Sequence, residues 1–313
     1  MSDKFFGIRL PEGKKRGGIV QTAGIVYQSW KEVEATVGDD DGVGTFKLKA
    51  NIQRVDKGIG TLSCARQLKI NANKATITSS NKVKILGTNI HDENISEEIS
   101  LNGTTAVTST KAFKKIKAIE LPVQVNTPVK QVHTITVAGG AGTASGTVTT
   151  TITSANLTGS PVSVEAEVEK DDTKAIVAQK IADALNTDEE VSKIFVATTD
   201  DDDVIITNID YLADDATLAM AIADTDSTGV GATASGTDTT AGVEEDAIIV
   251  GYTEKLGLKV SARAVHNIAS YKDDTTDGSV SFTCDADEVE KNMIKFNASL
   301  GTGTRDTCYL VRE

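Results

Sequence analysis

"ISEEISLNGTTAVTSTKAFKKIKAIELP", residues 95–122, decides the fold class of this chain. Along 95–101 apolar side chains alternate with polar ones, and only Glu97 interrupts the apolar side. Such alternation over four to eight residues is typical of a half-buried β-strand. A second alternating stretch follows the pair Asn102-Gly103, which favours the positive φ angles of a two-residue type I′ turn. The stretch therefore predicts a β-hairpin, and it holds no His or Cys that would serve a reaction.

Similar short segments, rich in β-branched residues and bounded by Gly, Asn, Asp or Ser, occur before this stretch and again after residue 243. The chain has 26 glycines and 4 prolines, which suits many strands joined by tight turns. We expect residues 36–131 and 243–313 to form one discontinuous, mainly β domain, an antiparallel sandwich or barrel-like frame. A chain of 313 residues is long enough for two or three cores.

The segment between these halves carries all of the excess negative charge. Residues 132–242 hold 19 acidic and 4 basic residues, a balance of −15 within a chain of net charge −13. The remainder has 26 acidic and 28 basic residues. A shift in composition of this size predicts a separate inserted domain.

The pattern inside the insertion predicts a small α+β domain. Residues 133–152 resemble a hairpin around a Gly-rich turn, and 162–168 alternate as one strand. The period then changes to about 3.6 residues, with Val177, Ile181 and Leu185 on one helix face. We expect Asp171 or Asp172 to cap this helix, and a strand-turn-strand unit to follow across the acidic turn at 200–203.

The first 35 residues show no strand pattern, and Lys14, Lys15 and Arg16 lie there beside glycines. We expect an extended N-terminal arm of the kind that docks on a neighbouring subunit. The N-terminus has no apolar core of a signal peptide, and the chain has no apolar run long enough to span a membrane. These features predict a soluble protein that is made and folded in a cytoplasm.

No motif predicts a catalytic, cofactor or metal site. "GGAGTASG", residues 139–146, lacks the following helix and the Lys-Ser/Thr of a phosphate-binding loop, so we expect a flexible hairpin loop. The acidic clusters fit no EF-hand spacing, and the three histidines (His91, His133, His266) and three cysteines show no metal-ligand spacing. We therefore predict a protein that is not an enzyme.

Nucleic-acid binding is not expected, because phosphate contacts require a basic surface and the insertion is strongly acidic. "KAFKKIKAIE" contributes four lysines, Lys111, Lys114, Lys115 and Lys117. Two interpretations remain open for them. They either meet an acidic protein surface or protect a solvated edge strand from pairing with another chain.

Two segments resemble a recurrent family of tailed-bacteriophage structural proteins. In that family an S-E-x-I-x-L-N-G-T-T turn with an A-F-K-x-I continuation precedes a G-x-x-x-K-L-G-L segment. Residues 95–122 and "IIVGYTEKLGL", residues 248–258, are similar to these, with Asn102, Gly103, Phe113, Lys255 and Gly257 at matching positions. The insertion separately resembles an α+β module of phage head and tail proteins. In simpler members of the family the two segments nearly adjoin, so the insertion is a departure.

The resemblance implies a non-enzymatic virion protein without cofactors. We expect an auxiliary or decoration protein on the capsid exterior, bound to the major capsid protein and forming a homo-oligomer, with a trimer expected from capsid symmetry. A tail-tube or other tail protein is the alternative, and a host-surface adhesin the third class. The expected contact residues are Lys14, Lys15, Arg16, Phe113, Lys114 and Lys115.

Overall fold

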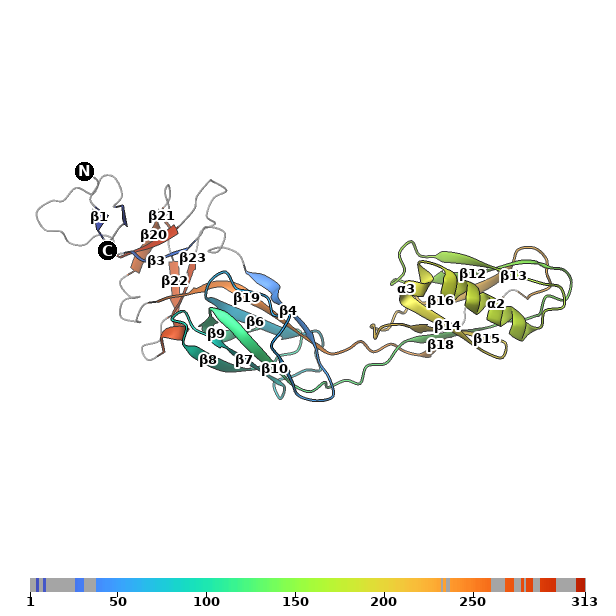
Figure 1. Ribbon diagram of the computed structural model, residues 1–313, viewed down its shortest axis with the longest axis horizontal. Coiled ribbons are helices and arrows are strands. Elements are labelled where there is room, and N and C mark those ends of the chain that lie inside the picture. The colour runs from blue at the N-terminus through green and yellow to red at the C-terminus, as the bar shows by residue number, and fades with distance from the viewer. Residues whose placement is uncertain are drawn as a thin grey trace, which may run out of the picture. The chain divides into compact units, whose positions relative to one another are not determined.

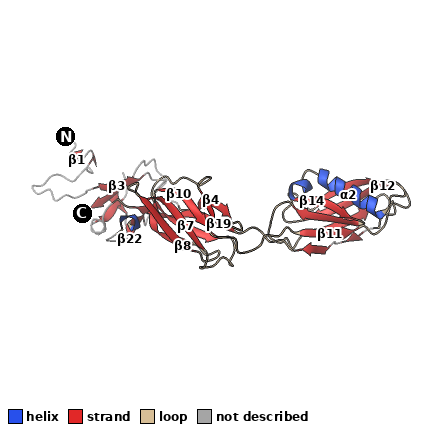
Figure 2. Ribbon diagram, turned by 60° about the horizontal axis from the view of Figure 1, so that its bottom comes forward, coloured by secondary structure: helices blue, strands red, loops and turns tan. Residues whose placement is uncertain are grey.

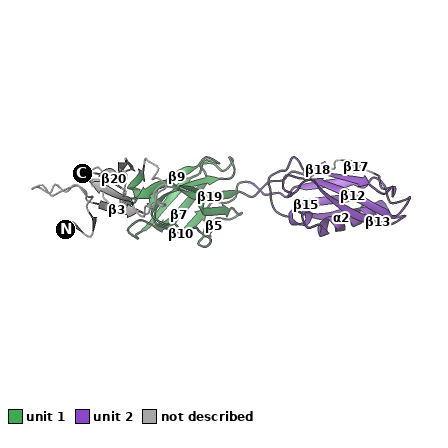
Figure 3. Ribbon diagram, turned by 90° about the horizontal axis from the view of Figure 1, so that it is seen from above, with its two compact units in different colours: residues 1–125, 246–313 green, residues 126–245 purple. Residues whose placement is uncertain are grey.

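The structure is a computed structural model in which the chain forms two compact units (Figures 1 and 3). Unit 1 comprises residues 1–125 and 246–313, and unit 2 comprises residues 126–245. The structure describes residues 38–231, 239–259, 288 and 290–295 in full, and elsewhere only the backbone of strands and of one short 3-10 helix. The insertion was predicted to span residues 132–242, and unit 2 spans residues 126–245.

Unit 1 is built from antiparallel strands, as predicted (Figure 2). Its first sheet has four strands in the order β5-β10-β7-β8. Their bounds are Gln53–Val55, Lys115–Leu121, Lys82–Thr88 and Asn94–Ser100. Buried and exposed residues alternate along β7, with Val83 and Ile85 wholly buried. One face of this sheet therefore packs on the core and the other faces solvent.

The second sheet of unit 1 has six strands, in the order β22-β23-β19-β6-β9 with β4 also paired to β19. Their bounds are Val280–Thr283, Met293–Phe296, Ala247–Gly257, Arg66–Ala72, Val107–Phe113 and Asp39–Lys47. Buried residues from both sheets, such as Leu68, Ile85 and Phe113, form one apolar cluster. Unit 1 thus contains a β-sandwich, which confirms the predicted fold class.

A further sheet of unit 1 changes the interpretation of the N-terminal arm. Its strands run in the order β21-β20-β24-β3, with bounds Asp277–Gly278, Ile268–Lys272, Cys308–Arg312 and Val26–Trp30. Strand β3 belongs to the segment predicted to be an extended arm, yet it pairs with β24 near the C-terminus. Two short strands of the same segment, β1 (Lys4–Phe5) and β2 (Ile8–Arg9), pair with each other in a separate two-stranded sheet. The rest of the predicted arm lies outside the described residues.

The hairpin predicted around Asn102-Gly103 is wrong in its pairing. Strand β8 pairs with β7 in the four-stranded sheet, whereas β9 pairs with β6 in the six-stranded sheet. Gly103 does have the expected positive φ, 59°. Its amide donates to the carbonyl of Ile77, and its carbonyl accepts from the amide of Ala72. The turn therefore carries the chain from one sheet of the sandwich to the other.

Unit 2 contains two four-stranded antiparallel sheets, with orders β14-β15-β11-β18 and β13-β12-β16-β17. The first has bounds Phe195–Asp200, Asp203–Asn208, Val132–Thr136 and Thr237–Thr240. The second has bounds Val162–Val168, Gly146–Thr153, Ala219–Asp224 and Thr233–Ala234. The predicted strand-turn-strand unit is present as β14 and β15. The predicted hairpin of 133–152 is wrong, because β11 and β12 lie in different sheets.

Helix α2, Lys174–Thr187, forms where the period of 3.6 residues predicted it. It contacts both β13 and β14, the edge strands of the two sheets, and so covers one side of the core (Figure 1). Thr173 caps it, since its hydroxyl accepts from the amide of Ile176 at 3.4 Å. The prediction of Asp171 or Asp172 as the cap is wrong, and Asp172 instead pairs with Lys180 at 2.7 Å. A single turn of helix, α3 (Val191–Ile194), follows.

The residues next to the two chain crossings pair with each other within each unit. In unit 1 the buried carboxylate of Asp246 accepts from the amide of Val125 at 2.6 Å and lies 3.6 Å from Lys74 Nζ. In unit 2 Val129 and Val243 exchange backbone hydrogen bonds of 2.9 and 2.8 Å. The two crossing segments are therefore paired within each unit, and each unit has a core of its own.

Candidate functional site

The outer face of the sheet β5-β10-β7-β8 carries an excess of positive charge. Cross-strand register places Glu120 opposite both Arg54 and Lys84, and Lys84 opposite Glu98. Residues directly opposite in an antiparallel pair point to the same side of the sheet. We call this surface the basic face; it has five basic side chains and two carboxylates, namely Arg54, Lys82, Lys84, Lys115, Lys117, Glu98 and Glu120.

Ion pairs neutralise only part of the basic face. Glu120 lies 3.0 Å from Arg54 and 3.6 Å from Lys84. Glu98 lies 2.6 Å from Lys82, and the hydrogen bond from Lys82 lowers the pKa of Glu98. These pairs are exposed, so each contributes little to folding stability.

Lys115 and Lys117, at the other end of the face, are exposed and have no carboxylate partner among the described residues. The ammonium group of Lys117 donates to the neutral amide oxygen of Asn94 at 2.6 Å. The pair alternates along β10 with the buried residues Ile116 and Ala118. Two adjacent positive charges therefore remain available at this end.

A shallow surface groove adjoins the basic face and has an apolar rim. Lys82, Lys84, Glu98 and Glu120 line it, together with Ile52, Ser80, Asn81, Leu121, Pro122 and Val123. Ile52 is 77% exposed and Val123 is 41% exposed, and Val125 nearby is 46% exposed. Apolar side chains collected beside charges are typical of protein contact surfaces rather than of enclosed substrate sites.

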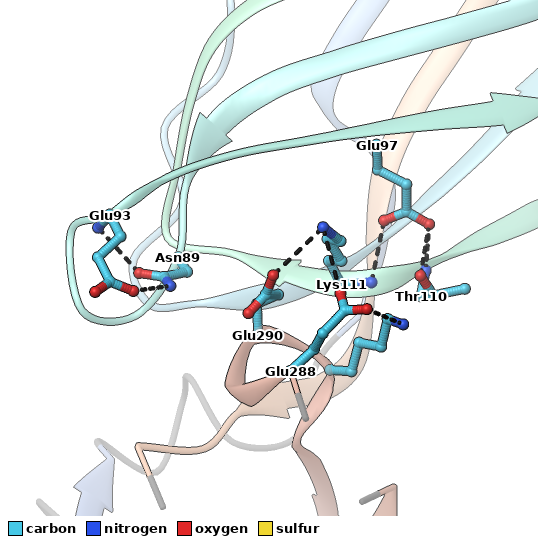
Figure 4. Close-up of polar contacts among 8 residues, drawn as sticks. Asn89, Glu93, Glu97, Thr110, Lys111, Glu288 and Glu290 are labelled. Carbon is cyan, nitrogen blue, oxygen red and sulfur yellow. Dashed lines mark hydrogen bonds and ion pairs between the residues drawn. The ribbon is translucent and has the colours of Figure 1, made fainter. Parts of the chain in front are cut away.

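A second polar cluster surrounds Lys111 on β9 (Figure 4). Its ammonium group lies 3.3 Å from Glu290 and 3.6 Å from Glu288, at the 3-10 helix η1 (Val289–Lys291). Glu97, on the neighbouring sheet, accepts from the amides of Thr110 at 2.6 Å and of Lys111 at 3.0 Å. These contacts connect three segments of unit 1, so we assign the cluster to folding rather than to binding.

The turn after β7 is held by Asn89, whose side-chain oxygen accepts from the amides of His91 and Glu93 (Figure 4). Its amide group donates to the Glu93 carboxylate at 2.9 Å. The same turn presents Asp92 to Lys114 at 2.7 Å, and this hydrogen bond lowers the pKa of Asp92.

The residues predicted as contacts lie in different environments. Lys14, Lys15 and Arg16 lie outside the described residues. Phe113 is wholly buried in the core of unit 1, so its side chain supports the fold and is not a surface contact. Lys114 is paired with Asp92, and Lys115 is exposed on the basic face. Partner contact by these two lysines stays a prediction.

The sequence motifs do not indicate that Arg54, Lys82 and Lys84 belong to the same surface. The motif "KAFKKIKAIE" did indicate Lys115 and Lys117, whose spacing of two places them on one side of a strand. Nothing in the sequence shows that β5 and β7 flank β10.

The Gly-rich loop 139–146 is not a hairpin loop. The amide of Ala141 donates to the carbonyl of Asp172, and that of Thr143 donates to the carbonyl of Thr228. A Cβ at Gly140 would lie 2.4 Å from the Asp172 carbonyl oxygen, so only glycine fits this approach. The loop therefore connects the two sheets of unit 2 and packs at the start of α2.

In the described part of the chain, no group of three or more His, Cys, Asp or Glu side chains is arranged to hold a metal ion. His91 is exposed in unit 1, His133 is buried in unit 2, and His266 lies outside the described residues. Neither α2 nor any other helix within that part has the length and hydrophobicity of a membrane span.

Comparisons with known proteins give no family. No family model matches this chain, and no curated protein matches it. Among solved structures, the flagellar cap protein FliD from Helicobacter pylori aligns with 88% of this chain and 85% of its own. The identity is 10% and the TM-score 0.26, a similarity too low to support an argument about fold or function.

Proposed function

We propose that this chain is a non-enzymatic structural protein of a virus particle, and specifically an auxiliary or decoration protein on the exterior of a tailed-phage capsid. The phage resemblance of residues 95–122 and 248–258 supports this proposal, as does the β-sandwich frame of unit 1. In this role the frame binds the major capsid protein, and the inserted unit extends into solvent.

The observation that carries the proposal is the division of charge between the units. Unit 2 has 21 acidic and 5 basic residues, whereas unit 1 has 24 acidic and 27 basic residues. A nearly neutral frame packs readily on another protein, because it brings little net charge into the contact. Two units of charge −16 repel each other, which keeps the exposed part of a crowded lattice soluble.

The test is binding to capsids that lack this protein. Purified protein is mixed with such capsids, sedimented, and imaged by negative-stain electron microscopy. We expect saturable binding and small projections on the capsid surface. A capsid pellet free of the protein would refute the proposal, and six-fold rings or tubes formed by the protein alone would favour the tail alternative.

The predicted arm contacts are tested in the same assay. Reversing the charges of Lys14, Lys15 and Arg16 to Glu is expected to weaken capsid binding. The matched control reverses Lys49, Lys57 and Lys69, which belong to other segments of the unit 1 sequence. Equal loss of binding in both variants would show a general charge effect and no arm contact.

A further inference from the structure

Each copy of this chain has two surfaces of opposite charge, and ion pairs within the copy do not neutralise the charge of either surface. One is the basic face of unit 1. The other is the outward side of β13 in unit 2, where Glu165 and Glu167 are exposed and alternate with buried Val164, Ala166 and Val168. Their cross-strand neighbours on β12 are Thr149 and Thr147, which are uncharged.

We propose that the basic face of one copy binds the acidic side of β13 in a second copy, with Lys115 and Lys117 meeting Glu165 and Glu167. The proposal goes beyond the function proposed above, because it concerns contact between copies and involves no capsid.

The two charge pairs have the same sequence spacing, two residues along a β-strand. Glu165 and Glu167 lie in a regular part of β13, where alternate residues are about 6.5 to 7 Å apart on the same side. The register of β10 against β7 shifts between Ile116 and Ala118, at Lys117, so the long lysine side chains must make up the departure from this spacing. Lys115 and Lys117 have no carboxylate partner among the described residues, and the same holds for Glu165 and Glu167. Pairing them across copies therefore breaks no ion pair within a copy.

The apolar side chains at the rim of the groove add a hydrophobic contribution to the contact, which does not depend on charge. Ile52 and Val123 are at least two-fifths exposed and line the groove at one end of the basic face. Burying such side chains between copies is favourable, while the surrounding charges determine which surface is accepted.

Charge also determines which surface of the second copy is selected. Two inserted units repel each other, because each carries −16. The basic face, with five basic groups against two carboxylates, attracts an inserted unit instead. The contact joins two different surfaces, so repeating it from copy to copy produces rings or open chains. Only two copies that exchange the contact across a two-fold axis form a closed dimer.

Sedimentation velocity of the full chain tests the proposal. At about 20 mM NaCl, where the Debye length exceeds 20 Å, we expect the average mass to rise with protein concentration. At about 0.5 M NaCl screening should return the chain to the monomer. A mass that stays monomeric at all concentrations in low salt would overturn the proposal.

Charge reversal tests the residues. The variants Lys115→Glu/Lys117→Glu and Glu165→Lys/Glu167→Lys should each lose self-association, and an equimolar mixture of the two should recover it. The control Lys57→Glu/Lys69→Glu makes the same change in net charge away from the basic face of unit 1 and should keep association. Circular dichroism and thermal melting confirm that each variant is folded. Association that both reversals leave unchanged, or that the mixture of folded variants fails to recover, would contradict the proposal.

A zero-length carbodiimide cross-linker distinguishes contacts between copies from other partners. It joins lysines to carboxylates that touch, and mixing ¹⁴N and ¹⁵N protein marks the links that join two copies. We expect mixed-isotope links from Lys115 or Lys117 to Glu165 or Glu167. Links found only within single copies, or only to carboxylates of unit 1, would overturn the proposal. None of these three experiments uses capsids, so their failure leaves the proposed virion role to be judged separately.

Discussion

Glu97 on β8 accepts a hydrogen bond from the backbone amide of Thr110 on β9 at 2.6 Å, and so joins the two sheets of the unit 1 sandwich. The register of β9 against β6 shifts between Gln67 and Lys69, so the opposing part of β9 is bulged. A bulge leaves backbone groups without their ladder partners. Glu97 also accepts from the amide of Lys111 at 3.0 Å, so one carboxylate satisfies both amides.

Replacing Glu97 by Ala should therefore destabilise unit 1. The loss of a charged acceptor for two backbone amides costs about 2 to 3 kcal/mol in the free energy of unfolding. The control is Glu98→Ala, which removes an exposed pair with Lys82 and should cost less than about 1 kcal/mol. Urea unfolding of both variants measures the difference. Equal midpoints would show that the Glu97 contacts add nothing.

The predicted hairpins failed for the same physical reason in both units. Alternation along 95–101 indicates that one side of the strand is buried, and Ile99 and Leu101 are indeed buried. It does not indicate which strand lies alongside, because consecutive strands of a sandwich alternate in the same way whether they share a sheet or face each other. Glu97, which seemed to spoil the apolar side, is the residue that connects the sheets.

Local patterns were reliable where the partner was also local. The helix at 174–187 and the turn between β14 and β15 were predicted because helix periodicity and turn chemistry lie within a few residues, although the cap is Thr173 and not the predicted aspartates. The basic face was only partly predictable. Lys115 and Lys117 were indicated by their spacing, but Arg54 and Lys84 join them only through the strand order.

Phe113 is buried in the core, whereas Lys115, only two residues further along the chain, is exposed. It ends β9 in one sheet, while Lys115 begins β10 in the other, so the two side chains are not on one side of a single strand. Phe113→Ala should destabilise unit 1 by about 3 to 5 kcal/mol, because it leaves a cavity in a packed core. Lys115→Ala should leave the unfolding midpoint unchanged. A small effect of Phe113→Ala in urea unfolding would contradict its assignment to the core.

Alanine substitutions at Gly103 and Gly58 distinguish the cost of backbone strain from the cost of steric overlap. Both have positive φ, 59° and 68°, but a Cβ at Gly103 would lie 2.9 Å from the Cα of Ala75, whereas a Cβ at Gly58 meets nothing within 4 Å. Gly58→Ala should cost about 1 kcal/mol from strain alone. Gly103→Ala should cost more, because the backbone near Ala75 must also move. Thermal melting compares them, and equal losses would show that the approach to Ala75 is easily relieved.

Asp215 should make the stability of unit 2 depend on pH. Its carboxylate accepts from the hydroxyl of Ser154 and the amide of Ala155, and from the amide and hydroxyl of Thr217. Burial raises the pKa of Asp215, but the hydrogen bonds from Thr217 and Ser154 outweigh it, so the pKa lies below the ordinary value of 3.8. A group with a lowered pKa stabilises the folded state above its unfolded pKa, and this contribution is lost as the pH falls through the folded pKa.

Asp215→Asn should therefore destabilise unit 2 at pH 7, by about 2 kcal/mol for the lost charged acceptor. The difference from the wild type should shrink below about pH 4, where the carboxylate of the unfolded chain is already protonated and that of the folded chain begins to be. Hydrogen-exchange mass spectrometry of peptides from residues 126–245 measures this unit directly. Asp210→Asn, at an exposed position, is the matched control and should exchange like the wild type at every pH. A gap between Asp215→Asn and the wild type that stays constant from pH 7 to pH 3 would show that the charge of this carboxylate does not stabilise the fold.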